Sequence, residues 1–315
     1  MRRRHGPVVA AVNVPQPASR TRWQLLWRRV KKTYQGYIFV SPAALHIAIV
    51  SYVAMFFSFY ISFREWDIIT EARPFVGLDN YRRAFADPVV HISFQNTIVY
   101  VLGIVPTLIA GSLLLAVLGN QVRKGRAIFR TIYFIPTITP GVVTAMLWIW
   151  IFEPTGVMNR LLRILGIRGP NWLFNKATAL PAVIIMTLWG ALGYYMILFM
   201  AGLSDIPQVF YEAAKVDGAN RWDTFWHITI PLLRNTLIFV FVTLTISAFQ
   251  MFTQVFIMTE GGPAYATQTV QLTVYQQAFL FLEMGYATSI SWMLFALIFL
   301  FSIIQLRLFI SRELY

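Results

Sequence analysis

The chain has 315 residues, of which 57% are hydrophobic and only 12% are charged, about half the charged fraction of an ordinary soluble domain. Its formal net charge is +13, and it has no cysteine, which excludes a disulfide framework and any site built on thiolates. A strongly apolar chain whose charges lie between long uncharged runs is typical of a polytopic membrane protein.

The first 36 residues carry nine Lys and Arg and no Asp or Glu. No apolar stretch with a small-residue cleavage site directly follows the basic start, so we expect no removable signal peptide, and we expect the first twenty residues to be disordered. Large apolar residues then recur at helical spacing beside basic ones, at Trp23, Trp27, Val30 and Tyr34. This pattern indicates either a basic helix lying on the membrane surface or an unstructured tail.

Six uncharged runs follow, and each is long enough to cross a hydrocarbon core about 30 Å thick. They are Tyr37–Phe63, Phe94–Gly119, Thr131–Phe152, Ala177–Leu203, Asn235–Met258 and Met284–Leu306. The sequence therefore predicts an all-α membrane protein with six transmembrane helices. None of these runs contains Asp, Glu, Lys or Arg, the usual carriers of proton or sodium coupling, which argues against a secondary carrier.

The distribution of charge predicts the orientation. If the N-terminus is cytoplasmic, the inside segments (1–36, 120–130, 204–234 and 307–315) hold 18 Lys and Arg against 5 Asp and Glu, whereas the outside segments hold 8 of each. The positive-inside rule then places both termini in the cytoplasm. The same distribution explains the net charge without nucleic-acid binding, because no base-reading motif accompanies the basic residues.

Three of the predicted outside loops have patterned residues. Phe75–Arg83 combines a Gly turn with aromatic and arginine residues, Gly156–Arg163 has the pattern of a short surface helix, and Glu260–Pro263 is a tight turn. A docking surface for another protein and ordinary loop closure both fit these residues.

Motifs of catalysis and metal binding are absent from the sequence. There is no G-x-x-x-x-G-K-[ST] loop to hold nucleotide phosphates and no G-x-S-x-G elbow. The four histidines are scattered, without an H-E-x-x-H motif. We therefore expect no catalytic residues, no metal site and no cofactor in this chain.

The stretch Ser204–Pro231 is the longest charged segment between two apolar runs, and it contains a turn at Gly218. Apolar residues at helical spacing on both sides of the glycine predict two short amphipathic helices that meet there. The first face is Phe210, Tyr211 and Ala214, and the second is Ala219, Trp222, Phe225 and Trp226. Asp205 and Gln208 are spaced to form a reciprocal cap on the first helix. Two apolar faces held outside the bilayer need a surface to pack against.

The run from Glu212 to Ala219, E-A-A-K-V-D-G-A, resembles the EAA loop of permease subunits of binding-protein-dependent ABC importers. Further segments also resemble that family: Val76–Tyr81, Arg130–Pro136, Gly156–Asn159, Ala201–Pro207, Thr259–Pro263, Tyr275–Phe279 and Gly285–Ala287. Together they resemble the carbohydrate-uptake branch, the maltose and glycerol-phosphate permease group, over about residues 37–310. The resemblance implies a cytoplasmic tail at 1–36, a six-helix permease domain at 37–310 with its coupling loop at 204–231, and a cytoplasmic C-terminus at 311–315.

In that family the EAA segment is the coupling helix that sits in a cleft of the ATPase subunit. The resemblance therefore implies that these residues contact an ATPase: Glu212, Ala213, Ala214, Asp217, Gly218, Ala219 and Phe225. An ordinary helical hairpin packed on its own spans is the alternative.

Alignment with the maltose relative places the substrate path on the fourth and fifth spans. The positions that align are Thr187, Gly190, Tyr194, Leu244, Ser247, Ala248 and Met251, and the neighbours Trp189, Phe249 and Gln250 could stack on or hydrogen-bond a sugar ring. Each of these residues has an alternative role as a helix-packing aromatic or a satisfied amide.

The resemblance implies a permease subunit that passes a carbohydrate, a di- or oligosaccharide, across the bacterial inner membrane. Its implied partners are a second homologous permease subunit, two copies of an ABC ATPase that bind ATP and Mg²⁺, and an extracytoplasmic solute-binding protein. The alternatives are an ABC importer permease for a non-sugar solute and a stand-alone channel or secondary carrier.

Overall fold

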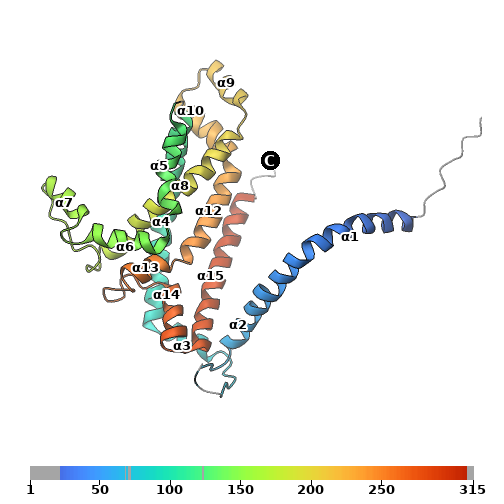
Figure 1. Cartoon of the computed structure of the whole chain (residues 1–315), viewed down its shortest axis with the longest axis vertical. Helices are drawn as coiled ribbons and strands as arrows, with labels where there is room; N and C mark the ends of the chain where they lie inside the picture. The colour runs from blue at the N-terminus through green and yellow to red at the C-terminus, as the bar shows by residue number, and fades with distance from the viewer. Residues whose placement is uncertain (1–21, 68, 70–71, 123, 311–315) are drawn as a thin grey trace, which may run out of the picture. The chain divides into compact units, whose positions relative to one another are not determined.

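The computed structural model describes residues 22–67, 69, 72–122 and 124–310, which are almost entirely helical (Figure 1). These residues form no β-strand, only isolated bridges from Arg64 to Phe75 and from Asp67 to Glu283. The prediction of an all-α fold is confirmed. Residues 1–21 and 311–315 lie outside the described ranges, so the expectations for the extreme tail and the C-terminal segment stay predictions.

The chain divides after Phe57 into two compact units. The first unit contains α1 (Arg22–Ile47), a π-helical segment (Ala48–Val53) and the start of α2 (Ala54–Ser62). Helical structure therefore runs unbroken from the basic segment into the first predicted span. The apolar stretch Gly36–Ser62 is long enough to cross a membrane, and no residue of its most apolar window is buried within the described chain. A surface position for the basic part of α1 remains a prediction.

The second unit contains the remaining helices. They are α3 (Asp79–Ala86), α4 (Pro88–Gln121), α5 (Arg126–Ile138), α6 (Gly141–Phe152), α7 (Val157–Ile164), α8 (Ala179–Ser204), α9 (Gln208–Val216), α10 (Arg221–Thr224), a π-helical segment (Phe225–Thr229), α11 (Ile230–Leu232), α12 (Arg234–Phe249), α13 (Thr253–Met258), α14 (Val270–Tyr275), a second π-helical segment (Gln276–Leu280) and α15 (Met284–Ile310).

Five segments of the described chain are long and apolar enough to cross a membrane. There are six if Arg221–Leu232 and Arg234–Phe249, which are bent by 68° at their junction, count as one span. The chain is thus a multi-pass membrane protein, as its uncharged runs predict.

The core of the second unit forms where α4 and α8 pack along each other. Small residues permit the close approach: a Cβ atom added at Gly103 on α4 would lie 2.9 Å from the Ile184 side chain on α8. On another side of α8, a Cβ added at Gly193 would lie 1.9 Å from the Tyr133 carbonyl oxygen of α5. These glycines fix the distances between α8 and its two neighbours.

The second span begins earlier than the uncharged run predicts, at Pro88 rather than Phe94. The Asp87 carboxylate accepts a hydrogen bond from the Val89 N–H (2.8 Å), and Pro88 occupies the first helical position, where its missing N–H is harmless. Hydropathy alone does not detect this polar cap.

Two predicted spans are wrong in detail because each is broken. The third, predicted at Thr131–Phe152, splits at Thr139 and Pro140, where Thr139 holds an extended conformation before α6. The fifth, predicted at Asn235–Met258, leaves the helix after Phe249 and resumes at Thr253. By length and composition α6 and α7 together, Gly141–Ile164, also qualify as a span.

A polar cluster ties the loop after the first predicted span to α15. The Arg83 guanidinium pairs with the Glu283 carboxylate (2.8 Å) and lies 4.0 Å from the Tyr286 ring centroid. The Tyr286 hydroxyl in turn donates to the Asp87 carboxylate (2.8 Å). Because these partners belong to α3, the cap of α4 and α15, the loop is held at one end of the helical core.

Candidate functional site

The segment after α8, residues 205–232, folds into two short helices that meet at Gly218, and we call this segment the elbow. α9 ends at Val216, and Gly218 follows with φ +77°, a conformation that L side chains rarely adopt. The Gly218 N–H donates to the Lys215 carbonyl (3.2 Å) and the Ala219 N–H to the Ala214 carbonyl (2.9 Å), the paired bonds of a Schellman helix end. The predicted turn at Gly218 is therefore present.

The predicted cap on the first helix is wrong. Pro207 is the N-cap of α9 and makes no side-chain cap, while Asp205 terminates α8 in a helical conformation and so cannot serve as the extended N-cap of α9. A capping box forms instead on the second helix, where the Asn220 side chain accepts from the Asp223 N–H (3.0 Å) and Asp223 accepts from the Asn220 N–H (3.3 Å).

The elbow has an inner and an outer face. Ala214 is buried, and the Tyr211 hydroxyl shares a hydrogen bond with Thr229 (3.2 Å), so these residues attach α9 to the helix that follows. On the outer face Glu212 and Val216 are exposed, Val216 by 87%. The predicted coupling residues therefore differ in their exposure. Ala214 packs inward, Ala219 and Phe225 are half-buried, and the exposed group is Glu212, Ala213, Asp217 and Gly218.

An exposed aromatic patch lies on the second half of the elbow. Trp222 and Trp226 are 72% and 57% exposed, and the half-buried Phe225 ring lies between them in edge-to-face contacts, 6.5 and 5.3 Å from their centroids. The predicted apolar face is thus present but is not covered by described residues. A cavity of about 690 Å³, with Lys215 and Arg221 in its lining, also separates the elbow from the end of α4. The elbow is therefore not packed tightly on its own spans.

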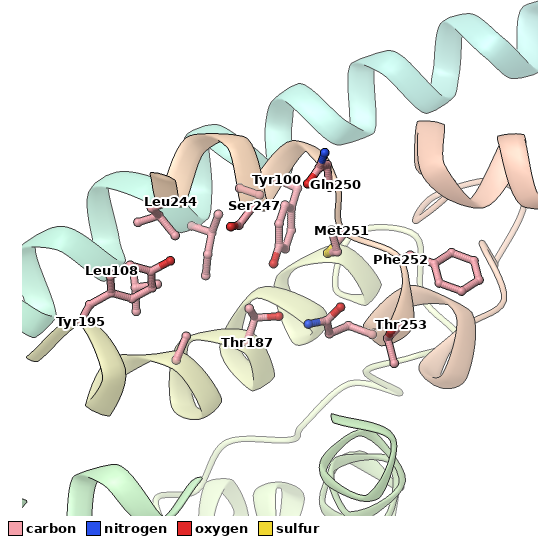
Figure 2. A pocket seen from close by; sticks show the side chains of 14 residues that line it. Tyr100, Leu108, Thr187, Tyr195, Leu244, Ser247, Gln250, Met251, Phe252 and Thr253 are labelled. Carbon is pink, nitrogen blue, oxygen red and sulfur yellow. The ribbon is translucent and has the colours of Figure 1, made fainter. Parts of the chain in front are cut away.

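A second site is a cavity of about 230 Å³ between α4, α8, α12 and α13 (Figure 2). Its lining comprises Tyr100, Ile104, Leu108, Thr187, Ala191, Tyr195, Leu244, Ser247, Ala248, Gln250, Met251, Phe252, Thr253 and Gln254. The break after α12 forms part of this wall, because the non-helical residues Gln250–Phe252 all contribute to it. Hydroxyl, amide and aromatic groups line the cavity, and no lining residue is charged.

Six of the ten predicted substrate-path residues lie in this lining: Thr187, Leu244, Ser247, Ala248, Gln250 and Met251. The other four, Gly190, Trp189, Tyr194 and Phe249, lie outside it. Trp189 packs against Trp148 at 5.9 Å, Tyr194 contacts the ring of Tyr195 edge-on at 5.1 Å, and the buried Phe249 packs against Phe301 at 5.4 Å. Trp189 and Tyr194 are 41% and 47% exposed on the surface of α8, so a role in the path would require a second subunit against that surface.

Four polar lining residues were not predicted from the sequence: Tyr100, Tyr195, Thr253 and Gln254. Figure 2 shows the Tyr100 hydroxyl directed from α4 toward the side of the cavity formed by Thr187 on α8. The sequence does contain a signal for these lining residues, because each is a hydrogen-bonding residue within an uncharged run. The sequence does not show which of many such residues face one another.

Across the described residues, helices long enough to span a membrane, an uncharged cavity between them and an exposed elbow at one end fit the permease class of transport proteins. The family model for the inner membrane component of binding-protein-dependent transport systems matches residues 108–310, and the chain belongs to this family.

Relatives support the same assignment. The chain is 38% identical over 282 residues to the probable ABC transporter permease protein YesP of Bacillus subtilis (strain 168), covering 88% of this chain and 91% of that protein. It is 31% identical to the arabinooligosaccharides transport system permease protein AraP of the same organism, over 94% of each. A bacterial ABC transporter involved in the import of the acidic polysaccharide alginate has a similar fold, with a TM-score of 0.79, 21% identity and coverage of 92% of this chain and 100% of that one.

Proposed function

We propose that this chain is the membrane-spanning subunit of an ATP-driven importer that passes a di- or oligosaccharide across the bacterial cytoplasmic membrane. A second homologous permease subunit, two copies of an ABC ATPase and an extracytoplasmic solute-binding protein complete the complex. ATP and Mg²⁺ bind to the ATPase, and this chain supplies no catalytic group. Both termini and the elbow lie in the cytoplasm, following the excess of Lys and Arg in those segments.

The observation that carries the proposal is the exposed elbow. Its outer face offers a carboxylate at Glu212, an alanine at 213 that permits close approach and a neighbouring aromatic patch, while its inner face is fixed to the chain by Ala214 and Tyr211. A surface whose two halves are joined to each other and whose outer face is uncovered suits docking to another protein. In the proposed complex, Glu212 makes a charge-assisted contact with the ATPase.

The coupling role is tested with the complete complex in liposomes, by measuring ATP hydrolysis and sugar uptake on one preparation. Glu212→Ala is expected to reduce uptake per ATP about tenfold, since losing a hydrogen bond to a charged group costs about 1.5–3 kcal/mol. Gly218→Pro is expected to reduce it as well, because proline cannot take the positive φ on which the turn between the two helices depends. Gly218→Asn is the matched control, because asparagine tolerates a positive φ whereas proline cannot adopt one. Normal uptake by both test variants, with normal membrane insertion, refutes the coupling assignment.

The cavity supports a neutral solute. Tyr100, Thr187, Ser247 and Gln254 can hydrogen-bond hydroxyl groups, and an ionic solute would find no compensating charge in the lining. A volume of about 230 Å³ is below the usual range of ligand pockets, about 300–1,000 Å³, so the second permease subunit would supply the remaining wall for a sugar chain. The name of the relative AraP, an arabinooligosaccharide permease, agrees with this substrate class.

Solute-stimulated ATP hydrolysis by the reconstituted complex identifies the substrate. We expect stimulation by a neutral oligosaccharide presented on its binding protein and none by amino acids, phosphate or acidic sugars. Tyr100→Phe should weaken the response, whereas Tyr52→Phe, at an exposed tyrosine outside the cavity lining, should not. Stimulation by an ionic solute alone contradicts the carbohydrate assignment, and solute uptake by the purified single chain contradicts the importer.

A further inference from the structure

The short helix α7 presents an apolar face that the described chain leaves uncovered. Val157, Leu161 and Ile164 lie on this face at helical spacing and are 55%, 55% and 80% exposed. Leu165, directly after the helix, is also exposed. The opposite face already packs on the protein through the buried Asn159. Because α7 is attached to the fold through its opposite face, the exposed apolar face is available for contact with something outside the described chain.

Hydrogen bonds between α7 and the residues before and after it hold this helix in one position. The buried Asn159 side chain donates to the carbonyls of Pro154 (3.3 Å) and Pro170 (3.1 Å) and accepts from the Trp172 indole N–H (2.8 Å). Gly169 lies so close to this amide that an added Cβ would be 1.9 Å from the Asn159 oxygen. The apolar face is thus presented by a fixed element.

The start of α7 lies at the last turn of α6. A Cβ atom at Gly156 would be 2.4 Å from the Trp150 carbonyl oxygen and 2.6 Å from that of Ile151, so the two backbones are in direct contact. Trp150 is 68% exposed at this end of an otherwise apolar helix, a position typical of the membrane–water boundary. Figure 1 shows α7 beside the end of α6, at the edge of the second unit. The helix therefore begins at the level where the span leaves the membrane.

Basic side chains lie alongside the apolar face. Arg160 and Arg163 are exposed, each uses its Nε atom to cap a nearby carbonyl, and neither forms an ion pair with any described carboxylate. Arg163 and Arg168, with Asn171, also line a cavity of about 280 Å³ that contains no acidic residue. Guanidinium groups are well suited to phosphate, which they can bind through two parallel hydrogen bonds.

We propose that α7 is a membrane anchor that lies in the boundary between the headgroups and acyl chains of a phospholipid leaflet. In the orientation proposed above, this is the outer leaflet. Its apolar face begins beside the end of α6 that carries the exposed Trp150, and its arginines bind lipid phosphates. Full insertion as part of a longer span would carry the arginines into hydrocarbon, whereas the boundary position buries the apolar residues and leaves the charges at the level of the phosphates. The anchor fixes the height of α6, which packs against α13 beside the cavity.

The absence of cysteine makes a direct test possible with the complete transporter in nanodiscs that contain phosphatidylglycerol. A spin label is attached at Ile164→Cys and, in a separate sample, at Thr155→Cys, an exposed polar position before α7. The rate at which the spin label collides with a paramagnetic reagent is then measured for two reagents. One is oxygen, which concentrates in lipid, and the other is a water-soluble nickel chelate. We expect oxygen collisions to exceed nickel collisions at least twofold at residue 164, and the reverse ratio at residue 155.

Other occupants of this face give different results, and each of them overturns the proposal. A nickel rate at residue 164 equal to that at residue 155 means that the face is in water. Low rates for both reagents mean that a protein covers it, and a fall in both rates only after the binding protein is added identifies that protein as the occupant. With the double variant Arg163→Gln/Arg168→Gln we expect the nickel rate at residue 164 to rise at least twofold, and an unchanged rate refutes phosphate binding by these arginines.

Discussion

The contact between α5 and α8 gives a sharp prediction, because two glycines on the same helix differ in their surroundings. Gly193 lies directly against α5, and a Cβ there would be 1.9 Å from the Tyr133 carbonyl oxygen and 2.9 Å from the Phe134 Cα. Gly190, one turn earlier, has no heavy atom within 4 Å of the corresponding position. Substitution by alanine should therefore destabilise the protein at residue 193 and leave its stability nearly unchanged at residue 190.

The magnitude follows from the distances. Ordinary van der Waals contact begins at 3.4 Å, so Gly193→Ala requires α5 and α8 to separate by about 1.5 Å. Overpacking usually costs about 1–3 kcal/mol, and we expect the upper end because the obstructing atoms are backbone and cannot rotate away. The separation also lengthens the nearby hydrogen bond from the Thr137 hydroxyl to the Gly190 carbonyl (3.0 Å), which is worth about 0.6 kcal/mol in a membrane.

The assay is the apparent melting temperature of the protein in nanodiscs at one heating rate, since unfolding of a membrane protein is commonly irreversible. A loss of about 3 kcal/mol corresponds to a fall of roughly 6 °C or more for Gly193→Ala. Gly190→Ala should stay within about 2 °C of the wild type, because alanine also favours the helix. Equal melting temperatures for the two variants would show that the close approach of α5 and α8 is wrong.

Three further predictions concern other contacts. Gly285→Ala should lower the melting temperature by a similar amount, since its Cβ would be 2.0 Å from the Arg64 carbonyl oxygen, and Gly141→Ala, with open space around it, is the control. Asn159→Ala should leave the α7 connection with unpaired polar groups and cost about 1–3 kcal/mol, measured as faster proteolysis of that loop than in the wild type; an unchanged cleavage rate counts against the network. Gln305→Leu should change the melting temperature by less than about 3 °C, because its buried partner Thr245 also donates to a backbone carbonyl (2.7 Å), and a large fall would contradict this account.

The parts of the fold that the sequence predicts are those with local causes. An uncharged run of more than 20 residues predicts a span because each charge at its centre would cost about 2.5–3.5 kcal/mol on insertion. The turn at Gly218 is predictable because a glycine between two amphipathic patterns can take a positive φ at low cost. The break at Pro140 also has a local signal, although Pro136 is accommodated inside α5.

The break after Phe249 has no such signal, since Gln250–Phe252 contains neither proline nor glycine. Its support comes from elsewhere in the chain: the Thr269 hydroxyl donates to the Met251 carbonyl (3.3 Å), satisfying a group that the interrupted helix leaves free. Thr269 is fixed in turn because its neighbour Val270 donates its N–H to Thr97 on α4 (3.1 Å). A kink held by such distant contacts cannot be read from residues near it.

The same reasoning explains why only part of the candidate cavity was predicted. Thr187 and Ser247 lie on the spans directly before and after the elbow. An alignment with the family can therefore be anchored on the nearby motif segments, Ala201–Pro207 and Thr259–Pro263. Tyr100 comes from a helix far away in sequence, and it reaches the cavity only because α4 packs along α8. The sequence identifies Tyr100 as a hydrogen-bonding residue, but only the packing of the helices shows that it faces the cavity.

The connectivity of the elbow links the two sites physically. α8 forms one wall of the cavity through Thr187 and Tyr195 and then leads directly into α9, while the second half of the elbow leads through α11 into α12, which forms the opposite wall through Leu244 and Ser247. Tyr211 and Thr229 join the two halves of the elbow, so a force on its outer face would act on both walls together. Packed helices move as rigid elements rather than deforming continuously. Tilting of the elbow by a partner would therefore change the width of the cavity, and in the proposed complex that partner is the ATPase.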